Sequence, residues 1–247
     1  MDNPEWKEYL KQFNLPAIYF NGISSNTNKY CVIVEPRKHE LLIPVIKNFM
    51  FILQNKGWGL IVCHGTDNEE FIKSGLDGWN NVKFINLNIS NFTLKEYNIF
   101  MTSPVLWNIL KHNGCEYALM FQPDVLLFKD NIDDYINYDY IGAPLTIFSN
   151  IIPLAFNGGF SLRNINTMIF ITNRFIYNQN VNEDIHFSYL INHVNKFNIP
   201  TVDIAKTFSV ETIFYNDPVG LHKPHDIFPD KSDLLKLLSK KFTIPSL

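Results

Sequence analysis

Acidic and histidine side chains follow three turn-like breaks in the sequence, and these are residue types that could do chemistry. Asp124 follows a proline in "YALMFQPDVLLF", Glu183 and Asp184 are adjacent in "NED", and His222 and His225 lie in "GLHKPH". A hard divalent cation prefers carboxylate oxygens, tolerates an imidazole and often completes its coordination with substrate phosphate. Asp124 together with one late histidine would make an open site of this kind.

Asp124 interrupts a run that otherwise has the character of a buried strand. An ionised carboxylate in apolar surroundings costs several kcal/mol unless it is paired, protonated or bound to a metal. We therefore expect a compensating group close to Asp124. The alternative is that Asp124 only caps the turn into Val125, which is a common role for Asp.

The other candidates also have structural alternatives. The acidic pair could mark only a helix N-terminus, where carboxylates meet unsatisfied amides and the positive end of the helix dipole. The two histidines could lie in surface loops. Gly158 and Gly159 in "FNGGFSLR" could mark a bulge or a tight turn, although glycine also lets a ligand approach the backbone closely.

Strand and helix patterns alternate through the first half of the chain. Apolar strand candidates occur at 29–35, 58–63, 82–87 and 117–121, and helical periodicities occur at 41–53, near 68–74 and at 103–112. Ser103 is expected to cap the last of these helices, with Pro104 at its first position. Strands of this kind between helices predict a parallel sheet that is covered on both faces. Ligands of such sheets bind at the carboxyl ends of the strands, which is where Asp124 falls.

The chain changes character after the fourth strand. The patterns predict a strand at 156–163 and a loop that leads into an amphipathic helix at 182–194. The segment 232–242 is basic and apolar and could touch a membrane surface, but its Ser/Asp start favours a helix packed on the sheet.

Length and composition favour one folded unit. Nearly half of the residues are apolar and no linker interrupts the chain, so one large core is expected. The predicted organisation is a single domain over 1–247, with an N-terminal extension at 1–28 and a tail helix within 226–247.

Composition also excludes several classes of protein. The formal charge of −3 leaves no basic stripe for a nucleic-acid polymer. No run approaches the ~20 apolar residues of a membrane span, and "MDNPEWKEYLKQF" lacks the apolar stretch of a secretion signal. Cys31, Cys63 and Cys115 lie in or beside apolar stretches, which suits reduced core thiols. These features predict a soluble protein in a reducing compartment such as the cytoplasm.

Seven segments of the sequence carry a resemblance to a known family. In chain order they are "VIVEPRKHELLIPVIKNF", "TSPVLWNIL", "ALMFQPDVLLF", "YDYIGAP", "NGGFSLRN", "NEDIHFS" and "GLHKP". Together they resemble the DUF5672 family, a group of uncharacterised GT-A-type glycosyltransferases, over roughly residues 30 to 225. The resemblance implies a single GT-A-like (Rossmann-like) α/β domain with a mixed, mostly parallel central sheet flanked by helices. It also implies a nucleotide-sugar donor.

The resemblance implies a metal site with one altered position. The common GT-A motif Asp-x-Asp is here Gln122-Pro123-Asp124. Asp124 would bind Mn²⁺ or Mg²⁺ directly, and Gln122 would take the weaker outer role. His222 would complete the metal site, and Lys223 would add positive charge beside the leaving phosphate.

The resemblance also implies the rest of the site. Asp184 corresponds to the base that deprotonates the acceptor hydroxyl in inverting relatives, and Glu183 to an acceptor or structural contact. Two adjacent carboxylates point in different directions, so only one is expected to face the sugar. The remaining assignments are Asn157, Gly158 and Gly159 to the floor of the sugar site, and Glu35 and Arg37 to the nucleotide base and ribose.

The resulting expectation is a metal-dependent hexosyltransferase. It would move a sugar from a nucleoside diphosphate sugar, with UDP as the expected nucleotide, to a glycan or other hydroxyl acceptor with inversion. A retaining outcome stays open, because "GLHKP" partly matches a segment of some retaining families. Two other functions stay open as well. One is a sugar nucleotidyltransferase, although "VEPRKHE" lacks a glycine-rich phosphate loop, and the other is a non-catalytic glycan- or nucleotide-binding module.

Overall fold

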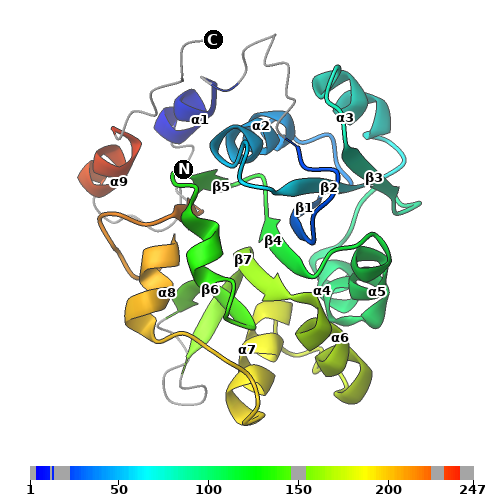
Figure 1. The fold of residues 1–247 in the computed structure, drawn as a ribbon, viewed down its shortest axis with the longest axis vertical. Coiled ribbons are helices and arrows are strands. Elements are labelled where there is room, and N and C mark those ends of the chain that lie inside the picture. The colour runs from blue at the N-terminus through cyan, green and yellow to red at the C-terminus, as the bar shows by residue number, and fades with distance from the viewer. Residues whose placement is uncertain (1–3, 12, 14–22, 146–153, 224–230, 240–247) are drawn as a thin grey trace.

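The computed structural model describes residues 4–11, 13, 23–145, 154–223 and 231–239. Its central sheet has six strands in the order β3-β2-β1-β4-β7-β6 (Figure 1). The bounds are β1 (Lys29–Val34), β2 (Gly59–His64), β3 (Val82–Asn86), β4 (Tyr117–Phe121), β6 (Tyr140–Leu145) and β7 (Ala155–Asn164). A second sheet, in the order β5-β9-β8, consists of β5 (Val125–Leu127), β9 (Gly220–His222) and β8 (Ser209–Val210).

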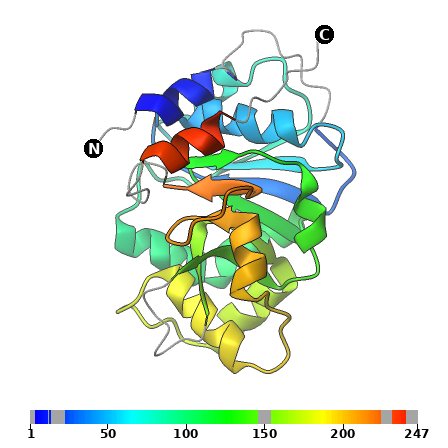
Figure 2. The same ribbon diagram turned by 90° about the vertical axis from the view of Figure 1, so that its left-hand side faces the viewer.

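The central sheet is mixed and mostly parallel, which confirms the expected α/β class. β1 pairs in parallel with β2 and β4, and β2 pairs in parallel with β3. β7 runs antiparallel to both β4 and β6. Figure 1 shows α1 and α2 at the top of the view and α5, α6 and α7 at the bottom, with the strands between them. The turned view of Figure 2 shows the same two helical layers.

The helices occupy most of the positions that the sequence patterns predict. Their bounds are α1 (Pro4–Lys11), α2 (Leu42–Ile52), α3 (Glu69–Gly75), α4 (Leu94–Thr102), α5 (Pro104–His112), α6 (Ile165–Arg174), α7 (Glu183–His193), α8 (Val202–Phe208) and α9 (Lys231–Leu238), with a 3₁₀ turn at Asn131–Tyr135. The expected tail helix is represented by α9. The rest of 226–247, apart from Ser239, lies outside the described residues.

Helix α4 is one of several elements that the sequence patterns do not predict; the others are α1, α6, α8, β5, β6, β8 and β9. Thr93 caps it, because its side chain accepts a hydrogen bond from Glu96 N while the Glu96 carboxylate accepts one from Thr93 N. The next helix, α5, begins as predicted, with Ser103 Oγ accepting from Val105 N and Pro104 at the first position. The unexpected helix brings two further side chains to the candidate site.

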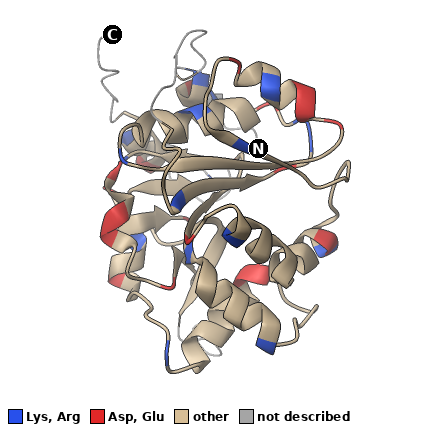
Figure 3. Ribbon diagram, turned by 45° about the vertical axis from the view of Figure 1, so that its right-hand side comes forward, with Lys and Arg blue, Asp and Glu red and all other residues tan. Residues whose placement is uncertain are grey.

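One apolar core joins these elements. It contains buried side chains from Trp6 in α1 to Leu237 in α9. Cys31, Cys63 and Cys115 are all buried and free, as expected for core thiols. Among the described residues, no helix is both long and apolar enough to cross a membrane. Figure 3 shows basic and acidic residues interspersed along the described ribbon.

Candidate functional site

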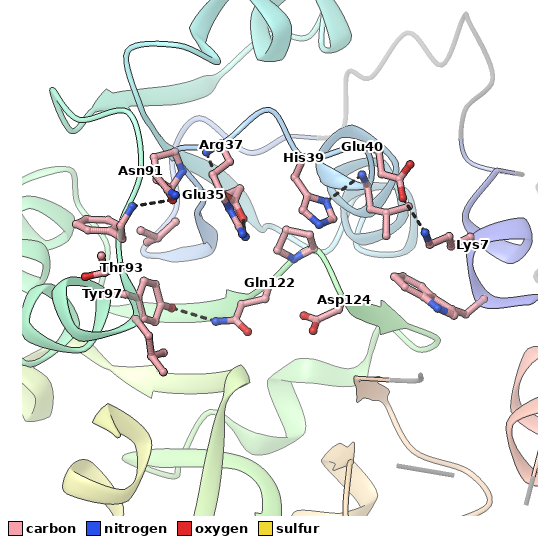
Figure 4. Close-up of a pocket in the computed structure, with 17 residues that line it drawn as sticks. Lys7, Glu35, Arg37, His39, Glu40, Asn91, Thr93, Tyr97, Gln122 and Asp124 are labelled. Atoms are coloured by element: carbon pink, nitrogen blue, oxygen red, sulfur yellow. Dashed lines mark hydrogen bonds and ion pairs between the residues drawn. The ribbon is translucent and has the colours of Figure 1, made fainter. Parts of the chain in front are cut away.

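A cavity of about 520 Å³ opens at the carboxyl ends of β1 and β4. This is the edge of the sheet where ligands of parallel α/β folds bind. Its lining residues are drawn in Figure 4, and they are Trp6, Lys7, Val34, Glu35, Pro36, Arg37, His39, Glu40, Leu41, Asn91, Phe92, Thr93, Leu94, Tyr97, Gln122, Pro123 and Asp124. The cavity therefore unites Glu35, Arg37, Gln122 and Asp124, four of the residues selected from the sequence.

Pairing between two short strands brings His222 to Asp124. β5 and β9 pair antiparallel with Val125 opposite His222. His222 Nε2 lies 3.4 Å from Asp124 Oδ1 and 3.2 Å from Gln122 Oε1. Lys223 N donates to the Asp124 carbonyl at 3.0 Å, with Lys223 in the left-handed backbone region at φ 48°. The compensating group expected near Asp124 is thus the imidazole of His222.

A second carboxylate flanks His222 on its other side. Glu211 Oε2 lies 3.3 Å from His222 Nδ1, although the pair lacks hydrogen-bond alignment. Burial lowers the pKa of His222, but the two carboxylates outweigh it and raise the pKa to about 9. Burial raises the pKa of Asp124, yet its contact with His222 leaves that pKa below its usual value. At neutral pH His222 is therefore an imidazolium, and it lies between Asp124 and Glu211.

A hard divalent cation fits this cluster only as an open site. The two oxygens of Asp124 and Gln122 lie 3.4 and 3.2 Å from Nε2 of His222. Neighbouring ligands of an octahedral cation bound at about 2.1 Å are about 3 Å apart. Among the described residues, no group of three or more His, Cys, Asp or Glu side chains could hold a metal ion. The remaining coordination positions would fall to water or to substrate oxygens.

The absence of a side chain at Gly159 makes the cluster possible. A Cβ at Gly159 would lie 2.3 Å from His222 Nε2 and 2.7 Å from Gln122 Oε1. Asn157, Gly158 and Gly159 lie within β7 where its pairing register with β6 shifts, and we call this bulged stretch the glycine turn. The Asn157 side chain stabilises it, because its Oδ1 accepts from Gly159 N at 2.6 Å. Gly159 therefore serves packing between β7 and the His222 cluster.

Gly159→Ala is expected to lower the free energy of unfolding by about 1–3 kcal/mol, because the added methyl group overlaps His222 and Gln122. Denaturant unfolding measures the loss. Gly159→Ala in a His222→Ala background is the control, and it should cost less because one of the two clashes is gone. Equal costs in both backgrounds would contradict the packing role.

Asp184 lies at the start of α7, against the other glycine of the turn. Its Oδ2 accepts from Gly158 N at 3.4 Å, and its Oδ1 accepts from Ile185 N at 2.8 Å. Burial, followed by the charge of Glu183, raises the pKa of Asp184 to about 6. A carboxylate with this pKa is ionised at neutral pH and is a stronger base than an ordinary aspartate.

Glu183 has a different environment from its neighbour. Both of its carboxylate oxygens accept hydrogen bonds from Arg163, each at 3.0 Å. The Glu183 side chain is 6% exposed and that of Arg163 is 0% exposed. The structure therefore places Glu183 in a buried ion pair and places Asp184 against the Gly158 amide.

Glu35 and Arg37 form an ion pair at the wall of the cavity. Glu35 accepts from Arg37 Nε at 2.8 Å and from a terminal guanidinium nitrogen at 2.7 Å. Glu35 is nearly buried, whereas the Arg37 side chain is 55% exposed. The exposed guanidinium is thus the part of this pair that a ligand can reach.

The selected residues form two clusters that meet on β7. One cluster contains Asp124, Gln122 and His222 against Gly159, and the other contains Asp184 against Gly158. The two glycines are consecutive, so both clusters share one turn. His225, the other late histidine, lies outside the described residues.

Several site residues are not evident from the sequence patterns. Tyr97 OH accepts from Gln122 Nε2 at 3.3 Å, and Asn98 Oδ1 accepts from Glu183 N at 3.0 Å, so α4 contacts the first cluster and the residue that precedes Asp184. The capping pattern Thr-x-x-Glu before α4 was the available signal. The others are Arg163, Glu211, Trp6 and Lys7. They carry no local signal, because their partners are distant in sequence.

Comparison with solved structures finds similar folds at low sequence identity. S. aureus TarS 1-349 matches with 17% identity and a TM-score of 0.43, covering 66% of this chain and 55% of that chain. Mannosyltransferase PcManGT from Pyrobaculum calidifontis, in complex with GDP-Man and Mn²⁺, matches with 9% identity and a TM-score of 0.44, covering 74% and 58%. Mouse xyloside xylosyltransferase 1 matches with 9% identity and a TM-score of 0.48, covering 78% and 97%. The chain thus spans little more than half the length of the first two.

Comparison with curated proteins finds no match. The sequence profile of a family described as "Protein of unknown function (DUF5672)" matches residues 81–222, which are more than half of the chain. The matched residues include Gln122, Asp124, the glycine turn, Asp184 and His222. The chain therefore belongs to the DUF5672 family.

Proposed function

We propose that this protein is a glycosyltransferase that moves a sugar from a nucleoside diphosphate sugar, with UDP as the nucleotide, to a hydroxyl group of a glycan or other acceptor. The observation that carries the proposal is the shared glycine turn. One of its glycines lies against Gln122 and His222 beside the cavity, and the other lies against Asp184. The pKa of Asp184 is raised to about 6, which suits a general base. A donor held in the cavity would present its diphosphate to the first cluster and its sugar to the second.

The cavity suits a nucleotide in size and chemistry. Its volume of about 520 Å³ lies within the ~300–1,000 Å³ of typical small-molecule sites. Apolar walls from Pro36, Leu41 and Pro123 alternate with charged groups, of which the exposed Arg37 guanidinium can donate to nucleotide oxygens. We assign the base and ribose to the Glu35–Arg37 side of the cavity.

The leaving diphosphate needs positive charge. The imidazolium of His222 lies beside Asp124 at the end of the cavity, and the charge of Lys223 acts on the same carboxylate; in our proposal these two groups supply the positive charge. Mn²⁺ or Mg²⁺, when held by Asp124, Gln122 and a deprotonated His222, would take the place of the imidazolium charge in neutralising the diphosphate. Gln122 orients its carbonyl oxygen toward His222 through its hydrogen bond to Tyr97.

Asp184 is the base in this proposal. Its carboxylate accepts the proton of the acceptor hydroxyl as that oxygen bonds to the anomeric carbon. The bond from the anomeric carbon to the diphosphate breaks, and the electron pair leaves with the diphosphate. Attack from the face opposite the leaving group inverts the anomeric centre. Asn157, Gly158 and Gly159 would form the floor beneath the sugar.

A non-catalytic nucleotide- or glycan-binding module is the second candidate. It is favoured by Gln122, which replaces the first carboxylate of the usual metal motif. Asp184 argues against it. A carboxylate whose pKa is raised by burial costs stability when it is ionised, and such costs are concentrated at catalytic sites rather than in modules that only bind. Three buried free cysteines support our placing of the protein in a reducing compartment such as the cytoplasm.

Hydrolysis of a panel of nucleotide sugars, measured with and without Mn²⁺, tests the proposed function. We expect slow release of UDP from at least one UDP-sugar, because many transferases pass the sugar to water when no acceptor is present. Calorimetry with UDP and GDP is the parallel measurement and should give binding in the micromolar range. Binding without hydrolysis would favour the non-catalytic module, and the absence of both would end the transferase proposal.

A further inference from the structure

We propose that Arg163 and Glu183 form a positioning pair, which holds Asp184 in place and takes no part in sugar transfer itself. The proposal rests on the assignment of Asp184 as the base. It concerns two residues whose side chains lie outside the cavity lining.

Arg163 is enclosed by fixed partners. Its Nε donates to Ser161 Oγ at 2.9 Å, and its terminal nitrogens donate to both oxygens of Glu183 and to the Gly158 carbonyl at 3.3 Å. Aromatic rings enclose the guanidinium, with centroid distances of 5.6 Å to Trp107, 4.8 Å to Tyr140 and 5.4 Å to Phe187. A planar guanidinium group with these partners is held in a single orientation.

The pair connects the two elements that carry the proposed base and the sugar floor. Arg163 and Gly158 belong to β7, and Glu183 is the first residue of α7. A Cβ on Gly158 would lie 2.1 Å from Glu183 Oε1 and 2.7 Å from an Arg163 nitrogen, so the pair reaches the strand only because this residue is glycine. The N-cap Asn182 makes no capping hydrogen bond, and Asn98 of α4 accepts from Glu183 N in its place.

Asp184 is fixed by the same contacts. It follows Glu183 directly, and its carboxylate accepts from Gly158 N, while the carbonyl of Gly158 accepts from Arg163. A movement of Glu183 away from Arg163 would therefore displace Asp184 from the turn. Buried ion pairs can often be replaced by apolar residues without loss of stability, so stability alone does not explain the pair. Its position beside Asp184 does.

The double variant Arg163→Met with Glu183→Leu separates positioning from stability. It removes both charges together, whereas either single variant leaves one buried charge unpaired. We expect the double variant to fold with an unfolding midpoint equal to or above that of the wild type. We expect kcat for donor hydrolysis to fall at least tenfold, with the Kd for UDP changed less than threefold. Arg174→Met, which removes an exposed arginine on α6, is the matched control and should retain wild-type kcat.

Hydrogen exchange of the Gly158 amide gives a readout that does not depend on activity. We expect it to exchange at least tenfold faster in the double variant, while Leu162 in the paired part of β7 stays protected. A folded double variant with wild-type kcat, or with unchanged Gly158 exchange, would overturn the positioning role. If the wild type neither binds nor hydrolyses any nucleotide sugar, the proposed function fails, and the Gly158 exchange alone decides whether the pair holds the turn.

Discussion

Asp184→Asn lowers donor turnover by about a hundredfold to ten-thousandfold, because the amide cannot accept the proton of the incoming hydroxyl. Donor affinity should stay within about threefold of the wild type, since Asp184 does not line the cavity. Steady-state kinetics together with calorimetry measure the two quantities. Near-normal turnover with intact donor binding would remove Asp184 as the base.

The pH profile is part of the same expectation. The base acts in its ionised form, and the pKa of Asp184 is raised to about 6. Turnover should therefore be level between about pH 6.5 and about pH 8, where His222 with its pKa of about 9 is still protonated, and fall roughly tenfold per pH unit below about pH 5.5. The asparagine variant should lose this acidic limb.

The stability of the same variant should change in the opposite direction. Folding raises the pKa of Asp184 from its ordinary value of 3.8. The native state therefore binds more protons than the unfolded state between these two values, and this residue costs stability as the pH rises through them. The cost is absent below about pH 3.8 and complete above about pH 6. Asp184→Asn should then raise the free energy of unfolding at pH 7.5 by on the order of 1–3 kcal/mol, with no gain at pH 3.5.

Asp124→Ala has the second largest expected effect. It removes the carboxylate at the end of the cavity and leaves the His222 imidazole with Glu211 as its remaining carboxylate partner. Turnover should fall about a hundredfold to a thousandfold, and the response of donor binding to Mn²⁺ should disappear. Asp203→Ala on α8 is the matched control, because within the described part of the chain this exposed aspartate pairs only with Lys206. Donor binding and a Mn²⁺ response that both survive in Asp124→Ala would show that this residue is not a metal ligand.

Local patterns were sufficient for most of the fold. Apolar runs such as "KYCVIV" and "YALMF" correctly predict strands because each is nearly continuous and bounded by turn residues. Ser103-Pro104 predicted the start of α5 because both residues act within one turn of the helix. The patterns do not predict helix α4 because "LKEYNIFMT" is short and buries only Asn98, Met101 and Thr102, so it lacks an apolar stripe.

The sequence predicts only part of the candidate site. The patterns correctly predict Asp124 at the carboxyl end of β4, because the carboxyl ends of parallel strands between helices lie at the same edge of the sheet. Its contact with His222 depends on the pairing of β5 with β9, two strands of three residues each. Strands this short have no reliable periodicity. Glu211 and Arg163 carry no local signal at all, since their partners lie 11 and 20 positions away.

The sequence by itself determined the α/β class, the position of most elements and the identity of the residues that could do chemistry. These follow from interactions within one turn or one strand, which the order of residues specifies directly. Only the tertiary structure decided which of them meet. Glu183 and Asp184 are neighbours of the same chemical type. Glu183 forms an ion pair with the buried Arg163, whereas Asp184 faces the backbone N–H of Gly158 and has a raised pKa. That division comes from the charges and burial around each carboxylate, which depend on packing between β7, α4 and α7.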